Sequence, residues 1–443
     1  MQRLLMEDLV RWKQSARRKP LVLKGARRVG KTWLLKEFGR LHYERTVYFN
    51  FEEHEEYRQF FGETRDIPRL LASLSMAGGK KITPETTLIL FDEIQACPDA
   101  LNSLPAFCEN APEYHIACAW SLLGTTMSGE MSLPAGKVNF RELHPMTFTE
   151  FLLASGEENL ASYLEQVQDL SPIPDSLFHP LSEKLKIYFI TGGMPEAVAG
   201  WTEGQDPERV QESLTEILGA YGRDFARYPR MRDVQKIRLI WESLPSQLAG
   251  ENKKFFYSAV KRGARAREYG DALKWLVDAG LVCQVFRSDS PAPLLSSRDD
   301  TSAFRLYPLD VGLLRRLSRL SPAAFAEGNR LFTECSGALS ESYVLQALRP
   351  QFDVTPRYWS VDNPHREVDF LIQYEDRLIP VEVDAAARRE SRSLKVFRDR
   401  YADRIRLRVC FSLQNLRLEE DFLNIPLFMA DQTERLLGIA LRG

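Results

Sequence analysis

The stretch GARRVGKT, at residues 25–32, constrains the fold of this chain more than any other part of its sequence. It matches the pattern G-x-x-x-x-G-K-[ST], and it lies between the apolar run PLVLKG and the helical pattern KTWLLKEFG, as the motif requires. Glycines let the backbone N–H groups of such a loop wrap around phosphate oxygens, and the start of the following helix favours an anion. The sequence therefore predicts a phosphate-binding loop between a strand and a helix.

We expect the whole loop to bind the phosphate chain of a nucleotide. Its residues are Gly25, Ala26, Arg27, Arg28, Val29, Gly30, Lys31 and Thr32. Lys31 should reach the β and γ phosphates, and the Thr32 hydroxyl should be a ligand of Mg²⁺. The side chains of Arg27 and Arg28 are expected to point outward, toward solvent or a neighbouring domain. ATP and Mg²⁺ are therefore the predicted ligands.

A pair of acidic residues supports this prediction. The run LILFDE ends in Asp92 and Glu93, at the exit of an apolar strand. We expect Asp92 to hold Mg²⁺ and Glu93 to orient the attacking water. Ser121, at the end of the next strand, is placed to act as a sensor of the γ-phosphate, although an ordinary strand-end serine is an equally good interpretation. ATP hydrolysis with Lys31, Glu93 and Ser121 as catalytic residues is the predicted reaction.

Short β-rich runs alternate with helical patterns through the first part of the chain. The runs lie at residues 20–25, 46–51, 86–93, 114–121 and 137–143. This alternation is typical of a parallel sheet covered by helices. We therefore predict an α/β fold with the phosphate-binding loop after its first strand.

The composition sets limits on the partners and the compartment. The 443 residues include 59 Lys and Arg against 61 Asp and Glu, so a contact with nucleic acid must come from local basic patches. No apolar run approaches the roughly 20 residues that cross a bilayer, and the acidic start argues against a signal peptide. The six cysteines form no C-x-x-C pair, which disfavours zinc and disulfides and fits a reducing cytoplasm.

The middle of the chain predicts a winged helix. Residues 255–287 have the pattern of a short helix, a turn, a longer helix and a strand, and residues 304–310 supply a second strand for a hairpin. The basic residues near these helices are Lys253, Lys254, Lys261, Arg262, Arg265 and Arg267. They could neutralise DNA phosphates, but winged helices also serve as packing modules, and both interpretations stay open.

Acidic residues near the C-terminal end have the pattern of a metal site. Glu341 lies on a predicted helix, and Asp369 and Glu382 lie on two successive predicted strands. Such a trio can hold a divalent metal that activates water for phosphodiester cleavage. A lysine two residues after the last acid would normally stabilise the charge that develops on the phosphate, but this position is Asp384. The pattern predicts a degenerate nuclease site. Lys395 on a following helix could substitute for the missing lysine, but a solvated charge on that helix face is the better interpretation.

A local basic surplus follows this site. Residues 388–408 contain eight arginines and Lys395 against Glu390, Asp399 and Asp403. The surplus suits a nucleic-acid backbone or an acidic protein partner. A charged helix face exposed to solvent is the simpler interpretation.

Several stretches together carry a family resemblance. They are KPLVLKGARRVGKTWLLKEFG, LILFDEIQ, LHPMTFTEFL, GGMPEAV, FRLYPLDVGLL and YWSVDNPHREVDFLI with IPVEVD. In combination they resemble a large family of prokaryotic AAA-type ATPases. The resemblance implies an AAA+ P-loop core, a winged helix and a C-terminal domain that looks like the PD-(D/E)xK, restriction-endonuclease-like fold. It also implies ATPase roles for Lys31, Thr32, Asp92 and Glu93 and the sensor position for Ser121.

Two positions depart from the pattern of that family. Trp120 replaces the glycine that usually precedes the sensor serine, and its bulk is expected to crowd the nucleotide side of the sheet. Asp384 replaces the lysine of the C-terminal motif. The first departure is expected to slow hydrolysis, and the second to abolish or weaken cleavage.

The length of the chain and these motifs predict four domains. They are an AAA+ core at 1–160, a helical lid or connector at 161–230, a winged helix at 231–320 and a nuclease-like domain at 328–443. We predict an ATP-dependent switch or remodeller whose C-terminal domain docks to DNA or protein, with a homo-oligomer as a further expectation. An ATP-gated metal-dependent nuclease and a nucleotide-bound interaction protein with negligible turnover are the alternatives.

Overall fold

The computed structural model describes most of the chain and divides it into two units. The described residues are 1–64, 66–125, 136–226, 231–250, 253–288, 295, 299–321, 336–360, 367–384 and 392–442. The first unit comprises Met1–His144 and Asp278–Leu281, and the second comprises Pro145–Val277 and Val282–Gly443. Apart from Ser321, the predicted linker at residues 321–329 lies outside the described residues. Within the described part of the chain, no helix is long and apolar enough to cross a membrane.

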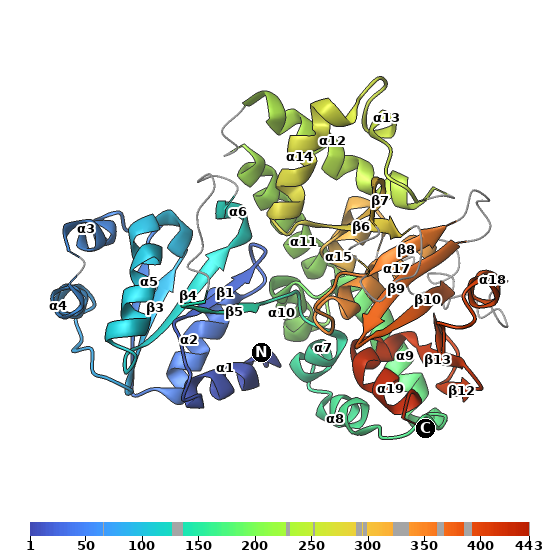
Figure 1. Ribbon diagram of the computed structural model, residues 1–443, viewed down its shortest axis with the longest axis horizontal. Coiled ribbons are helices and arrows are strands. Elements are labelled where there is room, and N and C mark those ends of the chain that lie inside the picture. Colours follow the sequence, from blue (N-terminus) through green and yellow to red (C-terminus); the bar gives the residue numbers. More distant parts are fainter. Residues whose placement is uncertain are drawn as a thin grey trace. The chain divides into compact units, whose positions relative to one another are not determined.

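Five parallel strands form the sheet of the first unit, in the order β2-β3-β4-β1-β5 (Figure 1). The strands are β1 (Leu21–Gly25), β2 (Arg45–Asn50), β3 (Thr87–Asp92), β4 (His115–Ser121) and β5 (Asn139–Glu142). All five predicted runs, and the predicted parallel α/β sheet, are thereby confirmed. Every residue of β3 and β4 is buried, as expected for central strands that are covered on both faces.

Helices cover both faces of this sheet. They are α1 (Leu5–Gln14), α2 (Lys31–His42), α3 (Glu56–Glu63), α4 (Ile67–Ala77), the 3₁₀ turn η1 (Ile94–Ala96), α5 (Pro98–Asn110) and α6 (Leu122–Thr125). On one face, Leu74 of α4, Phe107 of α5 and Trp120 of β4 share a hydrophobic cluster. The helix α2 packs on strands β1 to β4 and buries Leu34 and Phe38. The loop before α2 is therefore held between a buried strand and a buried helix.

The second unit contains an eight-stranded mixed sheet, in the order β12-β13-β11-β10-β9-β8-β6-β7. Its strands are β6 (Val282–Ser288), β7 (Asp299–Pro308), β8 (Arg357–Ser360), β9 (Glu367–Tyr374), β10 (Arg377–Asp384), β11 (Arg408–Ser412), β12 (Arg417–Glu419) and β13 (Phe422–Pro426). The predicted hairpin is confirmed, because β6 and β7 pair antiparallel. Its strand β6 also pairs with β8, where Arg287 lies opposite Tyr358, so the hairpin extends the C-terminal sheet.

Helices surround this second sheet. They are α7 (Phe148–Ala154), α8 (Glu158–Gln166), α9 (Asp175–Thr191), α10 (Pro195–Gly204), α11 (Pro207–Phe225), α12 (Met231–Leu248), α13 (Tyr257–Val260), α14 (Ala266–Asp278), α15 (Val311–Leu317), α17 (Ser336–Leu348), α18 (Arg392–Arg400), η4 (Leu427–Gln432) and α19 (Thr433–Ala440). Helices α9 to α11 lie within the region predicted as helical, and Glu341 lies on α17 as expected; residues 227–230 lie outside the described residues. Helices α12, α13 and α14 precede the β6–β7 hairpin in the chain, which is the predicted order of elements for this region.

Three of the sequence stretches that carry the family resemblance, around Met146, Gly193 and Asp310, meet at one buried junction in the second unit. The backbone N–H of Met146 donates to the carbonyl of Gly193 at 2.7 Å, and the N–H of Gly193 donates to the Asp310 carboxylate at 2.6 Å. Gln346 of α17 donates to the same carboxylate at 3.1 Å. A Cβ atom on Gly193 would lie 2.2 Å from the Met146 carbonyl oxygen, so only glycine fits there. The junction ties together segments that lie far apart in the sequence.

Candidate nucleotide-binding site

The phosphate-binding loop turns sharply from β1 into α2. Gly30 has a φ of 95° and Arg28 a φ of 69°, both in the left-handed region. Gly30 is the N-cap of the 12-residue helix α2, and it offers no side-chain cap to the first N–H groups. These N–H groups and the helix dipole form the type of site that binds an anion. The first glycine is required as well, because a Cβ on Gly25 would lie 2.4 Å from the carbonyl oxygen of Leu143.

Lys31 lies inside the loop and is 5% exposed. Its ammonium group donates to the carbonyls of Gly25 at 3.1 Å and Ala26 at 2.8 Å. Burial lowers the pKa of Lys31 to about 8, although the carboxylates of Glu93 and Asp92 oppose the shift. The lysine is therefore already directed toward the backbone that would surround a phosphate.

The two loop arginines differ in exposure. The side chain of Arg28 is exposed, and that of Arg27 is partly buried, with its guanidinium 3.8 Å from the Glu52 carboxylate. Arg28 therefore has the exposed position that was expected, whereas Arg27 lies near enough to Lys31 for its charge to oppose protonation of the lysine and lower its pKa.

The predicted magnesium ligands are in direct contact. The Thr32 hydroxyl donates to the two carboxylate oxygens of Asp92 at 2.9 and 3.0 Å. The hydroxyl of Tyr48, on the neighbouring strand β2, donates to the same carboxylate at 2.7 Å. A hydroxyl and a carboxylate are ligands that suit Mg²⁺. The sequence analysis missed Tyr48, although the parallel pairing of Asn50 with Asp92 places β2 beside β3 at this edge.

Glu93 leaves the strand with a left-handed φ of 49°. The side-chain amide of Gln95 donates to the Glu93 carboxylate, and its carbonyl oxygen accepts from the backbone N–H of Ser121 at 3.3 Å. Burial raises the pKa of Glu93, while the nearby Lys31 ammonium opposes the shift. Gln95, which the sequence analysis missed, therefore connects Glu93 to the end of β4.

Ser121 is the last residue of β4. Ser121 pairs with Gly25 in the parallel register of β4 and β1, so Ser121 lies beside the first residue of the loop. The hydroxyl oxygen of Ser121 is buried and has no hydrogen-bond partner among the described residues. Because an unsatisfied buried hydroxyl is costly, this arrangement favours the sensor interpretation over an ordinary strand-end serine.

Trp120 does not occupy the same space as this hydroxyl. It is 1% exposed and packs in the hydrophobic cluster that includes Leu104 and Phe107 of α5. Successive side chains of a strand point to opposite faces, so Trp120 and Ser121 diverge. The bulk of the tryptophan fills the core, which corrects the expectation that it crowds the nucleotide side.

The C-terminal acidic residues form a second cluster, centred on Glu341. The Lys253 ammonium group contacts one oxygen of this carboxylate. The other oxygen accepts from the Tyr307 hydroxyl at 3.0 Å and lies 3.7 Å from the Arg305 guanidinium. Burial raises the pKa of Glu341, and the charge of Asp369 adds to the effect. Glu341 and Asp369 therefore lie close together, and the two cations Lys253 and Arg305 lie beside them.

Asp369 is engaged on both sides. One oxygen accepts from the backbone N–H of Val383 at 2.9 Å, and the other lies 4.0 Å from the Lys253 ammonium group. Burial and the charges of Asp369 and Asp384 raise the pKa of Glu382 on β10. Within the described residues, no group of three or more His, Cys, Asp or Glu side chains is arranged to hold a metal ion.

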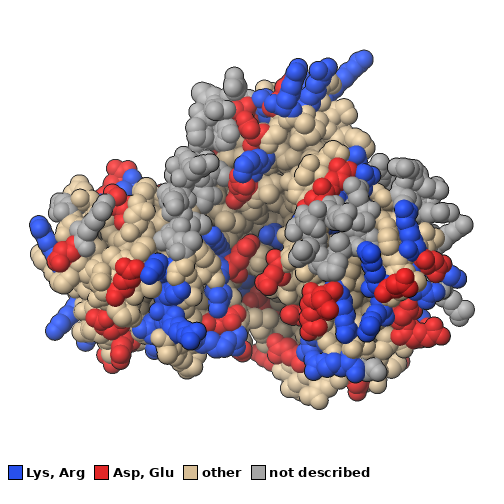
Figure 2. Space-filling view, in the orientation of Figure 1, with Lys and Arg blue, Asp and Glu red and all other residues tan. Residues whose placement is uncertain are grey.

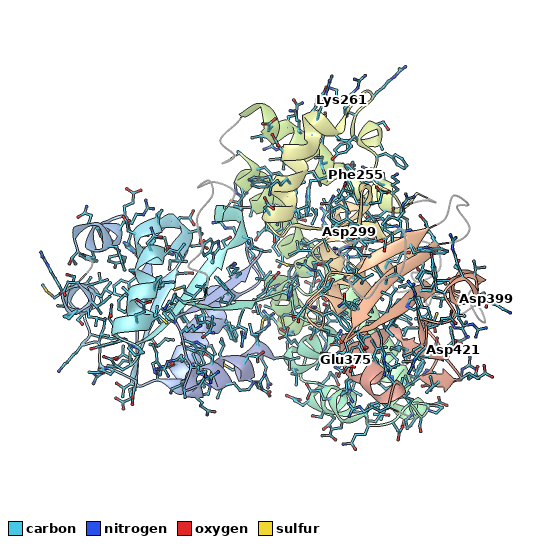
Figure 3. The ribbon with its side chains drawn as sticks, in the orientation of Figure 1. Phe255, Lys261, Asp299, Glu375, Asp399 and Asp421 are labelled. Atoms are coloured by element: carbon cyan, nitrogen blue, oxygen red, sulfur yellow. The ribbon has the colours of Figure 1, made fainter. Side chains whose placement is uncertain are left out.

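Some of the basic residues that were predicted to contact nucleic acid are exposed, and others are already in ion pairs. Lys253 belongs to the acidic cluster, whereas Lys261, Arg262, Arg265 and Arg267 are exposed around α13 and the start of α14. Figure 2 shows Lys and Arg side chains in blue on the surface at this end of the second unit, and Figure 3 labels Lys261 there.

In the C-terminal basic segment, two arginines are already paired. Arg408 lies 2.6 Å and Arg398 3.3 Å from the carboxylate of Asp421, which lies between β12 and β13 and is labelled in Figure 3. Residues 385–391 of this segment, including Arg388 and Arg389, lie outside the described residues.

Comparison with protein families finds a described domain in the first part of the chain. Residues 17–152 match the model of an AAA domain. Residues 182–324 and 336–428 match two domains of unknown function, DUF8612 and DUF4143. No protein with a curated description matches the chain. The first unit therefore contains a domain similar to AAA domains, in agreement with its five-stranded parallel sheet.

Comparison with solved structures finds matches at low sequence identity. A Walker-type ATPase of Pyrococcus abyssi has a TM-score of 0.43 and 14% identity, covering 71% of this chain and 95% of that one. The Orc1 protein of Aeropyrum pernix, in complex with DNA, has a TM-score of 0.29 and 15% identity, covering 71% and 90%. The RuvB Holliday junction branch migration motor of Thermotoga maritima has a TM-score of 0.29 and 14% identity, covering 65% and 89%.

Proposed function

We propose that the AAA domain binds ATP with Mg²⁺ and hydrolyses it, and that the nucleotide state controls the second unit as a switch or remodeller. The observation that carries this proposal is the direct contact between Thr32 and Asp92 at 2.9 and 3.0 Å. It places the two expected ligands of Mg²⁺ together. It lies at the start of α2, next to Lys31, where the helix N-terminus favours phosphate.

Each polar group of the site has a role in such a reaction. When bound between Thr32 and Asp92, Mg²⁺ would neutralise charge on the phosphates. Lys31 can exchange its two backbone carbonyl acceptors for phosphate oxygens. The raised pKa of Glu93 suits a group that orients water and takes up its proton. The buried Ser121 hydroxyl supplies a donor for the γ-phosphate or the water.

The second unit supplies the docking surface in this proposal. The order of α12, α13, α14 and the β6–β7 hairpin supports a winged helix, and its exposed cations Lys261, Arg262, Arg265 and Arg267 favour DNA as the partner. The C-terminal strands and α17 would then be a nuclease-like frame without nuclease activity. The engagement of Glu341 and Asp369 by Lys253 and Arg305 counts against the alternative of an ATP-gated nuclease.

Steady-state ATP hydrolysis tests the proposal. Turnover would be measured with Mg²⁺, with and without duplex and single-stranded DNA, and Lys31→Ala would provide the blank. We expect turnover that Lys31→Ala abolishes and that DNA increases. Loss of the DNA effect in Arg265→Glu, with basal turnover retained, would support the docking surface. Turnover equal in wild type and Lys31→Ala would refute the ATPase proposal, and turnover indifferent to DNA would favour a protein partner.

A further inference from the structure

A cluster of charged side chains in the second unit has no part in the proposed ATPase site. The carboxylates of Glu341 on α17 and of Glu367 and Asp369 on β9 surround two cations from outside the C-terminal segment. These cations are Lys253, which precedes α13, and Arg305 on β7. The cluster therefore joins the two stretches that match domains of unknown function.

Arg305 is a permanent member of this cluster. Its side chain is 0% exposed, and its guanidinium lies 2.7 Å from Glu367 and 3.7 Å from both Glu341 and Asp369. It also lies 4.4 Å from the centre of the Tyr358 ring on β8. Because a buried arginine stays charged, it supplies a fixed positive charge inside the sheet.

Lys253 is held in a different way. Its φ of 50° is left-handed, and it lies two residues before Phe255, which Figure 3 labels. The backbone N–H of Phe255 donates to the carbonyl of Phe304 on β7 at 2.8 Å, and the two rings stack with centroids 5.5 Å apart. The N–H of Phe256 donates to Gln247 of α12 at 2.7 Å. The backbone is thus anchored, and the lysine side chain, 19% exposed, reaches the cluster from its rim.

The positions that a metal ion would use in this cluster are already engaged. Both oxygens of Glu341 contact protein donors, and one oxygen of Asp369 accepts from the backbone. The remaining oxygen of Asp369 faces Lys253 at 4.0 Å and Arg305 at 3.7 Å. Buried carboxylates need a nearby positive charge, since desolvation of unpaired charges is strongly unfavourable. Lys253 provides that charge at the accessible edge of the cluster.

We propose that the Lys253 ammonium group is the resident cation of this carboxylate cluster and occupies the place that a divalent cation would take. Mg²⁺ or Mn²⁺ binds to Glu341 and Asp369 only when Lys253 is withdrawn or replaced. In the wild-type chain the contact keeps the cluster closed to metal. It also stabilises the connection between the segment before α13 and the C-terminal sheet.

Binding of Mn²⁺ to the nucleotide-free full-length protein, followed by electron paramagnetic resonance, tests the proposal. We expect Lys253→Met to gain an Mn²⁺ site that the double variant Lys253→Met/Asp369→Asn lacks. The single variant Asp369→Asn, which keeps Lys253, should bind Mn²⁺ no differently from the wild type. Lys254→Met, at the adjacent lysine, is the matched control and should gain no site.

Thermal unfolding of the same proteins gives an independent readout. We expect Lys253→Met to unfold at a lower temperature than the wild type and to be restabilised by Mn²⁺. If the variant does not fold alone, Mn²⁺ added during refolding should restore cooperative unfolding, and failure to do so would overturn the proposal. Two other results would overturn it: wild-type Mn²⁺ binding that Asp369→Asn removes, or a folded Lys253→Met without a new site.

Discussion

The hydroxyl of Thr32 donates to both carboxylate oxygens of Asp92, at 2.9 and 3.0 Å, and so joins the start of α2 to the end of β3. We predict that Thr32→Ala weakens ATP binding in the presence of Mg²⁺ about tenfold, or ~1.4 kcal/mol, because one metal ligand is lost. Thr32→Ser, which keeps the hydroxyl, should bind nearly as well as the wild type. Titration with a fluorescent ATP analogue measures the nucleotide affinity of both variants, once in the presence of Mg²⁺ and once in the presence of EDTA. An equal loss in EDTA would mean that the substitution disturbs the loop itself.

Glu93→Gln should lower kcat for ATP hydrolysis by about 10²-fold or more, because the amide cannot take up the proton of the attacking water. Nucleotide affinity should change little, since Glu93 is not expected to bind the phosphates. Glu109→Gln, at a surface carboxylate that pairs with Lys137, is the control and should be neutral. A slow turnover that Glu93→Gln leaves unchanged would show that Glu93 is not catalytic.

Trp120→Ala should destabilise the first unit by about 3–5 kcal/mol, the usual cost of removing a buried aromatic side chain. The matched substitution Trp33→Ala removes a side chain that is 43% exposed on α2, and it should cost far less. Urea unfolding, followed by fluorescence, measures the free energy of unfolding of the two variants. Similar losses in the two variants would contradict the buried position of Trp120.

Gly193→Ala should destabilise the second unit by about 2 kcal/mol or more, because the added Cβ would overlap the Met146 carbonyl oxygen. Gly270→Ala on α14 is the control, since a Cβ there meets no atom within 4 Å. It should be neutral or stabilise the helix by up to about 1 kcal/mol. Calorimetry of the two variants measures this difference, and a tolerated Gly193→Ala would contradict the close packing of the junction.

The pH dependence of stability should contain a contribution from His115 on β4. Burial, and then the charges of Arg18 and Lys13, lower the pKa of His115 to about 4. Between pH 6.5, the ordinary pKa, and about pH 4, His115 is protonated in the unfolded chain but neutral in the folded chain. The free energy of unfolding therefore falls as the pH falls through this window.

His115→Gln removes this titration. The Tyr43 hydroxyl lies 2.7 Å from Nδ1 of His115. Because the variant changes this contact, it should be less stable than the wild type at pH 7, and the difference should shrink as the pH approaches about 4.5. Chemical unfolding at both pH values measures the two differences. A difference that is independent of pH would refute the lowered pKa.

The sequence was sufficient for features that depend on local pattern. The strand, loop and helix around Lys31 follow from glycine spacing and hydrophobic alternation, and Asp92 and Glu93 follow from their place at a strand end. The partners Tyr48 and Gln95 were missed because their roles depend on strand order and on a side chain that bridges two strands.

Lys253 is the clearest case of a residue whose contacts could not be predicted from the sequence. In the sequence it is one of several basic residues before a predicted helix, and its charge suggested DNA. Its partner Glu341 lies 88 positions later, so only tertiary structure connects them. The β6–β7 hairpin was predicted from its own residues, but its pairing with β8 has no local signal.

The shared eight-stranded sheet has a consequence for how this protein evolves. Strands β6 and β7 belong to the segment that matches DUF8612, while β8 to β13 belong to the segment that matches DUF4143. A recombination event that exchanged one segment alone would separate β6 from β8 and expose two strand edges, which are prone to aggregation. We therefore expect lineages to inherit the two segments together, with substitutions at their common border occurring in compensating pairs.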